Sequence, residues 1–216
     1  MKKLHLGCGQ RYFDGYLNID FPLSEHTVQE DSVADEFHDL LALSYPQGSI
    51  AEVRLHHVFE HFTRVQASAL LASWNAWLQP GGIVHIEVPD LGRTAKAVLS
   101  AFTGHKAKQV GLRHIFGSQE AHWAVHYDGY TKASLHALLK SFGFTPDRTV
   151  QERYKATYNL TVIAHKASDL TEQQALDAAQ AHLSEYMVDE SPSEQRLLST
   201  WMNDFKAQLA KTRGGS

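Results

Sequence analysis

The sequence is poor in cysteine. Cys8 is the only cysteine among 216 residues. A single cysteine excludes a disulfide within the chain and a zinc site built from cysteine pairs. Because free thiols are typical of reducing compartments, we expect a cytoplasmic protein.

Long apolar runs and an excess of basic charge are also lacking. No run approaches the ~18 apolar residues of a membrane-spanning helix, and Gly7 interrupts the apolar start too early for a signal peptide. Lys and Arg number 20 against 24 Asp and Glu, a net charge of −4. Bulk charge therefore attracts neither nucleic acid nor an anionic membrane, and we expect neither as a partner.

What is present fits one globular domain with a small appendage. The chain is 43% hydrophobic and 20% charged, which excludes global disorder, and its compositional oddity is 14 histidines. Strand-like and helix-like segments alternate as far as residue 142, which is typical of a parallel α/β sheet. The stretch 10–15 is too short for a full crossover helix, so we expect the first helix to be truncated or absent.

Individual elements follow from periodicity and from turn residues. The expected strands are 3–6, 16–20, a weak one within 33–40, 53–57, 83–88, 148–153 and 159–164. The expected helices are 67–78, 93–103, 106–116 and 131–142, with Pro80-Gly81-Gly82 ending the first of them. Two further amphipathic helices, 171–186 and 193–211, suggest a division into a domain 1–167 and a helical appendage 168–213.

The first strand runs directly into Gly7-Cys8-Gly9, and the second ends in Asp20. Glycines allow a ligand to approach the backbone closely, and an acid at the next strand tip can accept hydrogen bonds from ribose hydroxyls. A dinucleotide site would need a third glycine and a helix N-terminus facing the pyrophosphate. Gln10, Arg11 and Tyr12 follow instead, so a nucleoside ligand fits better than NAD or a nucleotide sugar.

Six segments together resemble the class I methyltransferases that use S-adenosylmethionine, and in particular a compact bacterial group with an LGCG…GY.N.D opening. They are LHLGCG (4–9), GYLNID (15–20), HDL (38–40), HHVFEHF (56–62), WLQPGGIVHIEVPDL (77–91) and HYDGYTKASLHALLKSFGF (126–144). The resemblance implies a Rossmann-like, mostly parallel seven-stranded sheet with an antiparallel last strand. It also implies methyl transfer with S-adenosylhomocysteine as the product.

The same resemblance implies a cofactor site. Gly7, Cys8, Gly9 and His57 would lie along the methionine and ribose portions, and Asp20 would bind the ribose hydroxyls. Phe21, Asp39 and Leu40 would surround the adenine. His5 stands where many members of the family carry an acid, so any contact which that acid makes to the cofactor's amino group must be made otherwise.

Histidines are the candidates for activating an oxygen or nitrogen nucleophile, because their pKa lies near neutrality. We select His57, His61 and His126 as catalytic candidates, with His122 as a further proton acceptor. Glu60 would shape the pocket or cap a helix. His57 and His61 with His122 or His126 could form a three-ligand metal site, but HExxH and cysteine pairs are absent, and no metal is expected.

The segment 115–130 is the expected substrate lid, or alternatively a packed loop over the sheet edge. Its candidate substrate residues are Glu120, His122, Trp123, Tyr127 and Tyr130, which join Glu60. The expected function is methyl transfer to an O or N atom of a small molecule, such as a saccharide or secondary metabolite. The alternative is a protein that binds S-adenosylmethionine without catalysis. The C-terminal helices would close the pocket or form a homodimer.

Overall fold

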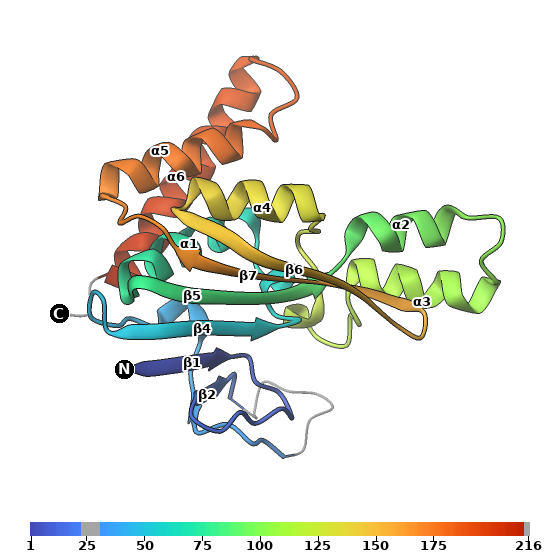
Figure 1. Ribbon diagram of the computed structural model, residues 1–216. Coiled ribbons are helices and arrows are strands. Elements are labelled where there is room, and N and C mark those ends of the chain that lie inside the picture. The colour runs from blue at the N-terminus through green and yellow to red at the C-terminus, as the bar shows by residue number, and fades with distance from the viewer. Residues whose placement is uncertain (23–30, 214–216) are drawn as a thin grey trace.

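A computed structural model describes residues 1–22 and 31–213. It contains a seven-stranded sheet in the order β3-β2-β1-β4-β5-β7-β6 (Figure 1). The strands are β1 (Lys2–Leu6), β2 (Leu17–Asp20), β3 (Glu36–Phe37), β4 (Ile50–His56), β5 (Leu78–Pro89), β6 (Phe144–Tyr154) and β7 (Thr157–Lys166). Strand β7 is antiparallel to both of its neighbours and the other pairings are parallel, which confirms the expected fold class.

The chain between β1 and β2 contains turns and no helix, as expected. Arg11 N donates to the carbonyl of Cys8, and Tyr16 N donates to that of Phe13. The weak third strand is shorter than predicted, because pairing with β2 is limited to two residues. Asp39 lies beyond it, as the N-cap of the 3-10 helix η2 (Leu40–Ala42).

The start of β5 differs from the prediction. The helix α1 (Arg64–Trp77) ends at Trp77, and the strand begins at Leu78, before Pro80-Gly81-Gly82. The physical reason is a bulge: Leu78 pairs with Ile50, and pairing resumes at Glu52 with Ile83. The Pro80-Gly81-Gly82 segment is thus a bulge within β5, and Gly81 in it has a φ of +71°.

The helices after β5 are α2 (Leu91–Leu99), α3 (His105–Phe116) and α4 (Lys132–Ser141). Thr131 caps α4 and Gly143, with φ +81°, follows its end, as predicted. Figure 1 shows α1 and α4 on the same side of the sheet, whereas α2 and α3 project beyond the carboxyl end of β5. No helix in the described ranges is long and apolar enough to cross a membrane.

The main core lies between the sheet and helices α1 and α4. Val84, Ile86 and Val88 of β5 are fully buried, as are Leu70 and Trp74 of α1. The alternating residues of β5 point to the opposite face, because side chains alternate along a strand. That opposite face carries the polar His85 and Glu87.

The C-terminal helices α5 (Glu172–Ser184) and α6 (Pro192–Arg213) join the same core. Leu183 and Phe205 are fully buried. Gln208 Nε2 donates to the carbonyl of Leu41 over 2.6 Å, which fixes α6 beside η2. The boundary at 167/168 and a role for this segment in dimerisation stay predictions.

Candidate cofactor and acceptor site

A cleft of about 630 Å³ lies at the carboxyl ends of β1, β2 and β4. Its walls contain most of the residues expected to bind the cofactor: Gly7, Gly9, Asp20, Phe21, Asp39, Leu40 and His57. His61, Glu120, His122, Trp123 and Tyr127 also line it. Cys8 is not among the lining residues. Its side chain is 4% exposed, and burial raises the pKa of its thiol to about 12.

The turn Gly7-Cys8-Gly9 leaves space for a ligand, but its backbone amides already donate hydrogen bonds within the protein. The amides of Gly7 and Cys8 both donate to the carbonyl of Ile19, over 2.8 and 3.1 Å. Gly7 has a φ of +66°, and a Cβ built on it would lie 2.4 Å from Val58 Cγ2. Since Val58 also lines the cleft, only glycine leaves the turn and the cleft wall in their present positions.

Two carboxylates mark one part of the cleft. Asp20 Oδ2 accepts a hydrogen bond from Gly9 N over 2.9 Å, and Asp20 Oδ1 accepts one from Phe21 N over 2.8 Å. Asp39 Oδ1 accepts from Leu41 N over 2.9 Å. A carboxylate has about four lone-pair directions, so both residues retain acceptor capacity for a polyol or an amino group.

His57 sits in a strained backbone conformation where β4 ends. Its φ is +55°, which is uncommon for any residue other than glycine, and its amide donates to the carbonyl of Glu87. Its Nδ1 lies 3.3 Å from Glu60 Oε1 and its Nε2 lies 3.2 Å from Glu87 Oε1. Burial disfavours the charged ring, but the hydrogen bonds to both carboxylates outweigh burial and raise the pKa of His57 to about 9.

The carboxylates respond in the opposite direction. Burial opposes the ionisation of Glu60, but its hydrogen bond with His57 and the nearby histidines hold its pKa below the usual value. Close contacts with His56 Nδ1, at 3.5 Å, and with His57 Nε2, at 3.2 Å, lower the pKa of Glu87 strongly. His57 is therefore a cation held between two anions, and neither of its nitrogens offers a free lone pair.

A second cavity of about 430 Å³ adjoins the cleft. The two share His57, His61, Glu120 and Trp123 as common walls. The second cavity is completed by Glu60, Val110, Arg113, His114, Gly117, Ser118, Ala124, His126 and Thr157. Polar and charged side chains thus line both cavities: Asp20 and Asp39 belong to the cleft alone, and Glu60, Arg113 and His114 to the second cavity alone.

The predicted lid forms a closed loop over this cavity. Gly117 and Val125 form an antiparallel bridge at its base, and the 3-10 helix η4 (His122–Ala124) lies within it. Tyr127 N donates to the carbonyl of Glu60 over 2.9 Å. This contact holds the end of the lid against the 3-10 helix η3 (Phe59–His61).

The structure brings some sequence-predicted residues to different places. Tyr130 is 4% exposed. It lines, with Glu60, a void of about 10 Å³ and lines neither of the two large cavities. His126 lines the second cavity and not the cleft. The possible metal ligands also regroup: instead of His57 with His61, ligand atoms of Glu60, His61 and His126 lie within 4.8 Å of one another.

Several lining residues were missed from the sequence. Thr63 and Gln66 form a capping box at the start of α1, and both line the cleft. The Thr-x-x-Gln spacing was a readable signal for a helix N-terminus. Glu87 lines neither cavity but contacts His57, and it was readable as the one acid at the end of an otherwise apolar strand. Arg113 and His114 carried no signal beyond their position in a helix before the lid.

No protein-family model matches the chain, and no curated protein matches it. Solved structures do. An S-adenosylmethionine-dependent methyltransferase from Mesorhizobium loti is 17% identical, with a TM-score of 0.50 over 76% of this chain and 90% of its own. The chain has the fold of these methyltransferases. A chain from the complex of the Haloferax volcanii Trm112 methyltransferase activator is 13% identical, with a TM-score of 0.54 over 80% of this chain and 86% of its own.

Proposed function

We propose that the protein transfers a methyl group from S-adenosylmethionine to an O or N atom of a polar small molecule. The observation that carries the proposal is the joining of two cavities. One is bordered by Asp20 and Asp39, the other by a cluster of polar side chains, and His57, His61, Glu120 and Trp123 stand between them. A donor and an acceptor in neighbouring cavities would meet at that boundary.

The residues of the cleft suit the cofactor. A volume of about 630 Å³ is within the range of ligand pockets. Asp20 and Asp39 offer acceptors for ribose hydroxyls and the adenine amino group, with Phe21 and Leu40 available to flank the ring. Gly7 and Gly9 leave room for the chain between ribose and methionine. Bound S-adenosylmethionine would supply a methyl group that is already activated by its sulfonium.

The protein's own contribution is alignment and exclusion of water. The lid is fixed at both ends by backbone hydrogen bonds, from His126 N to Phe116 and from Tyr127 N to Glu60. Trp123 lines both cavities at the boundary, where an aromatic ring would limit access of water. We propose Glu60, Glu120 and Trp123, which line the second cavity, as the acceptor-binding set; His122 and Tyr127 line only the cleft and would border the cofactor.

The three histidines would have different roles. His57 is held by two carboxylates, so we propose that it positions Glu60 and does not accept a proton. His61 and His126 line the second cavity. Each has one ring nitrogen that makes no hydrogen bond to another described residue, so we propose that these two histidines activate the acceptor. Polar walls around them favour a saccharide or another hydroxylated metabolite.

Isothermal titration with S-adenosylhomocysteine tests the cofactor part. We expect the wild-type protein to bind S-adenosylhomocysteine saturably at one site, and Asp39→Leu to bind it at least about tenfold more weakly. Titration with NAD should release no heat of binding. Asp20→Asn is a second variant, in which the loss of one carboxylate oxygen weakens the ribose contact. No heat with the wild-type protein at millimolar ligand would refute the proposal. Binding without turnover of any polar acceptor would favour the non-catalytic alternative.

A further inference from the structure

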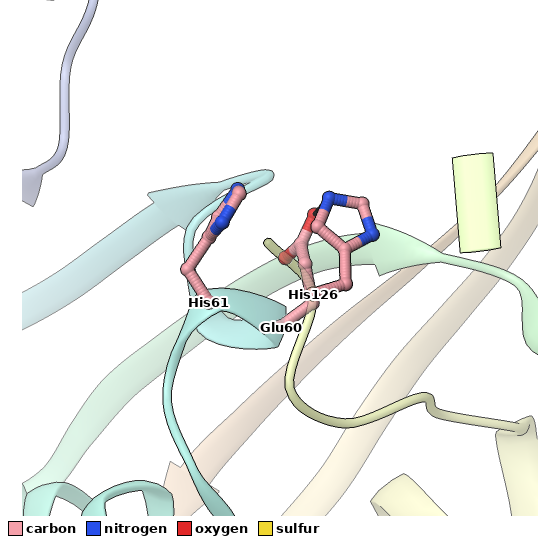
Figure 2. A group of neighbouring side chains, drawn as sticks. All are labelled: Glu60, His61 and His126. Carbon is pink, nitrogen blue, oxygen red and sulfur yellow. Dashed lines mark ion pairs between the residues drawn. The ribbon is translucent and has the colours of Figure 1, made fainter. Parts of the chain in front are cut away.

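The wall of the second cavity contains two imidazoles and one carboxylate in a compact group. One ligand atom each from Glu60, His61 and His126 lie within 4.8 Å of one another. Figure 2 shows the carboxylate of Glu60 between the two rings, with all three side chains directed to the same space. Glu60 and His61 come from η3, whereas His126 comes from the far end of the lid.

Glu60 has a buried oxygen that no described residue satisfies. The residue is 1% exposed, and its Oε2 is a buried atom with no hydrogen bond from the described part of the chain. The other oxygen, Oε1, lies 3.3 Å from His57 Nδ1 and 3.9 Å from His126 Nε2. A buried carboxylate oxygen without a hydrogen bond is costly. A cation bound at Oε2 would remove that cost.

His61 presents one nitrogen in the form that binds a metal. Its Nδ1 lies 3.1 Å from the carbonyl oxygen of Val125, so this nitrogen carries the hydrogen and donates it. The other nitrogen, Nε2, is then left with a lone pair. Metal-binding histidines characteristically donate their second N–H to a carbonyl or carboxylate in this way.

The backbone fixes the distance between the two parts of the group. Tyr127 N and Asp128 N both donate to the carbonyl of Glu60, over 2.9 and 3.4 Å. The rings of His61 and His126 meet edge to face with centroids 4.7 Å apart. The ligand atoms now lie within 4.8 Å of one another. Small side-chain rotations would place each of them about 2.0–2.2 Å from a common ion.

We propose that Glu60, His61 and His126 bind one divalent transition-metal ion such as Zn²⁺ or Mn²⁺. Two imidazoles and a carboxylate suit these ions better than Ca²⁺, which prefers oxygen ligands alone. Three protein ligands beside a cavity of about 430 Å³ leave coordination positions open. Resting on the proposed function, the ion would bind an oxygen of the acceptor and hold it at the boundary with the cleft.

The test measures metal binding without cofactor or acceptor. Protein freed of metal with a chelator is titrated with Zn²⁺ by calorimetry, and Co²⁺ is added in parallel to read its visible absorption bands. We expect one ion per chain. His61→Gln and His126→Gln should each weaken binding at least about tenfold and shift the Co²⁺ bands. Circular dichroism and melting without metal confirm that each variant is folded.

Adventitious binding to surface histidines is the main alternative, because the chain has 14 histidines. His165→Gln is the matched control, since His165 Nδ1 lies 2.7 Å from Asp147 Oδ1 in an exposed pair, and His165 lines neither cavity. We expect this variant to bind like the wild type. The proposal is overturned by no saturable site, by unchanged affinity in both cluster variants, or by an equal loss in His165→Gln.

This test separates the two proposals. Binding of S-adenosylhomocysteine without binding of Zn²⁺ would remove the metal site and leave the proposed methyl transfer in place. Binding of Zn²⁺ without binding of S-adenosylhomocysteine would retain the metal site and remove the proposed function.

Discussion

The glycine turn after β1 allows a quantitative test, because two glycines with positive φ differ in their surroundings. Gly7 has a φ of +66° and faces Val58, whereas Gly9 has a φ of +54° and no described atom within 4 Å of the place where a Cβ would lie. Alanine at either position adopts a left-handed conformation that costs about 1–2 kcal/mol. Alanine at position 7 additionally meets Val58 Cγ2 at 2.4 Å.

The added contact sets the size of the difference. Forcing extra atoms into a packed site costs about 1–3 kcal/mol. We therefore expect Gly7→Ala to lower the free energy of unfolding by about 2–5 kcal/mol. Gly9→Ala should lower it by only about 1–2 kcal/mol. Gly7→Ala should also weaken binding of S-adenosylhomocysteine, because Val58 is displaced into the cleft that it lines.

Urea denaturation measures both variants, and Val58→Ala completes a double-mutant cycle with Gly7→Ala. Removing the two methyl groups of Val58 leaves its Cβ at 3.3 Å, so the double variant should recover about 1–3 kcal/mol relative to additivity. Equal destabilisation by Gly7→Ala and Gly9→Ala, or strict additivity in the cycle, would refute the steric argument.

Three further predictions concern stability, each measured by urea denaturation. Burial lowers the pKa of His5 from 6.5 to about 4. Its contribution to stability is therefore fully present above pH 6.5, falls progressively between pH 6.5 and 4, and is lost below pH 4. His5→Gln should remove about 3 kcal/mol of that pH dependence. Asn75→Ala should cost about 2–4 kcal/mol, because its side chain makes three hydrogen bonds to the backbone within 142–170. Thr63→Ala should cost about 1 kcal/mol through loss of the cap to Gln66 N. An unchanged slope with pH, or losses below about 0.5 kcal/mol, would contradict the respective assignments.

The fold could be predicted from the sequence because its strongest segments obey local rules. Alternation of strands and helices, the Gly7-Cys8-Gly9 turn and the Thr131 cap all depend on residues close in the chain. The bulge in β5 could not be predicted, since it depends on the pairing of Leu78 with the distant Ile50. Strands β6 and β7 extend beyond the predicted ranges because the added residues pair with one another through the backbone, from Phe144 with Lys166 to Tyr154 with Thr157.

The site shows the same division. Asp20 ends a strand and Asp39 follows one, so their place at the carboxyl edge could be predicted. His57 was an expected base, but its pairing with Glu87 arises from neighbouring strands and changes its proposed role. The grouping of His126 with Glu60 depends on the folding of the whole lid, which sequence spacing alone does not encode.

The most direct test of the central claim is a crystal structure of the protein with S-adenosylhomocysteine. We expect the ribose hydroxyls at the Asp20 carboxylate, the adenine amino group near Asp39, and the sulfur at the boundary near His57, facing the second cavity. An adenosyl group bound elsewhere, or a sulfur directed away from that cavity, would contradict methyl transfer between the two cavities.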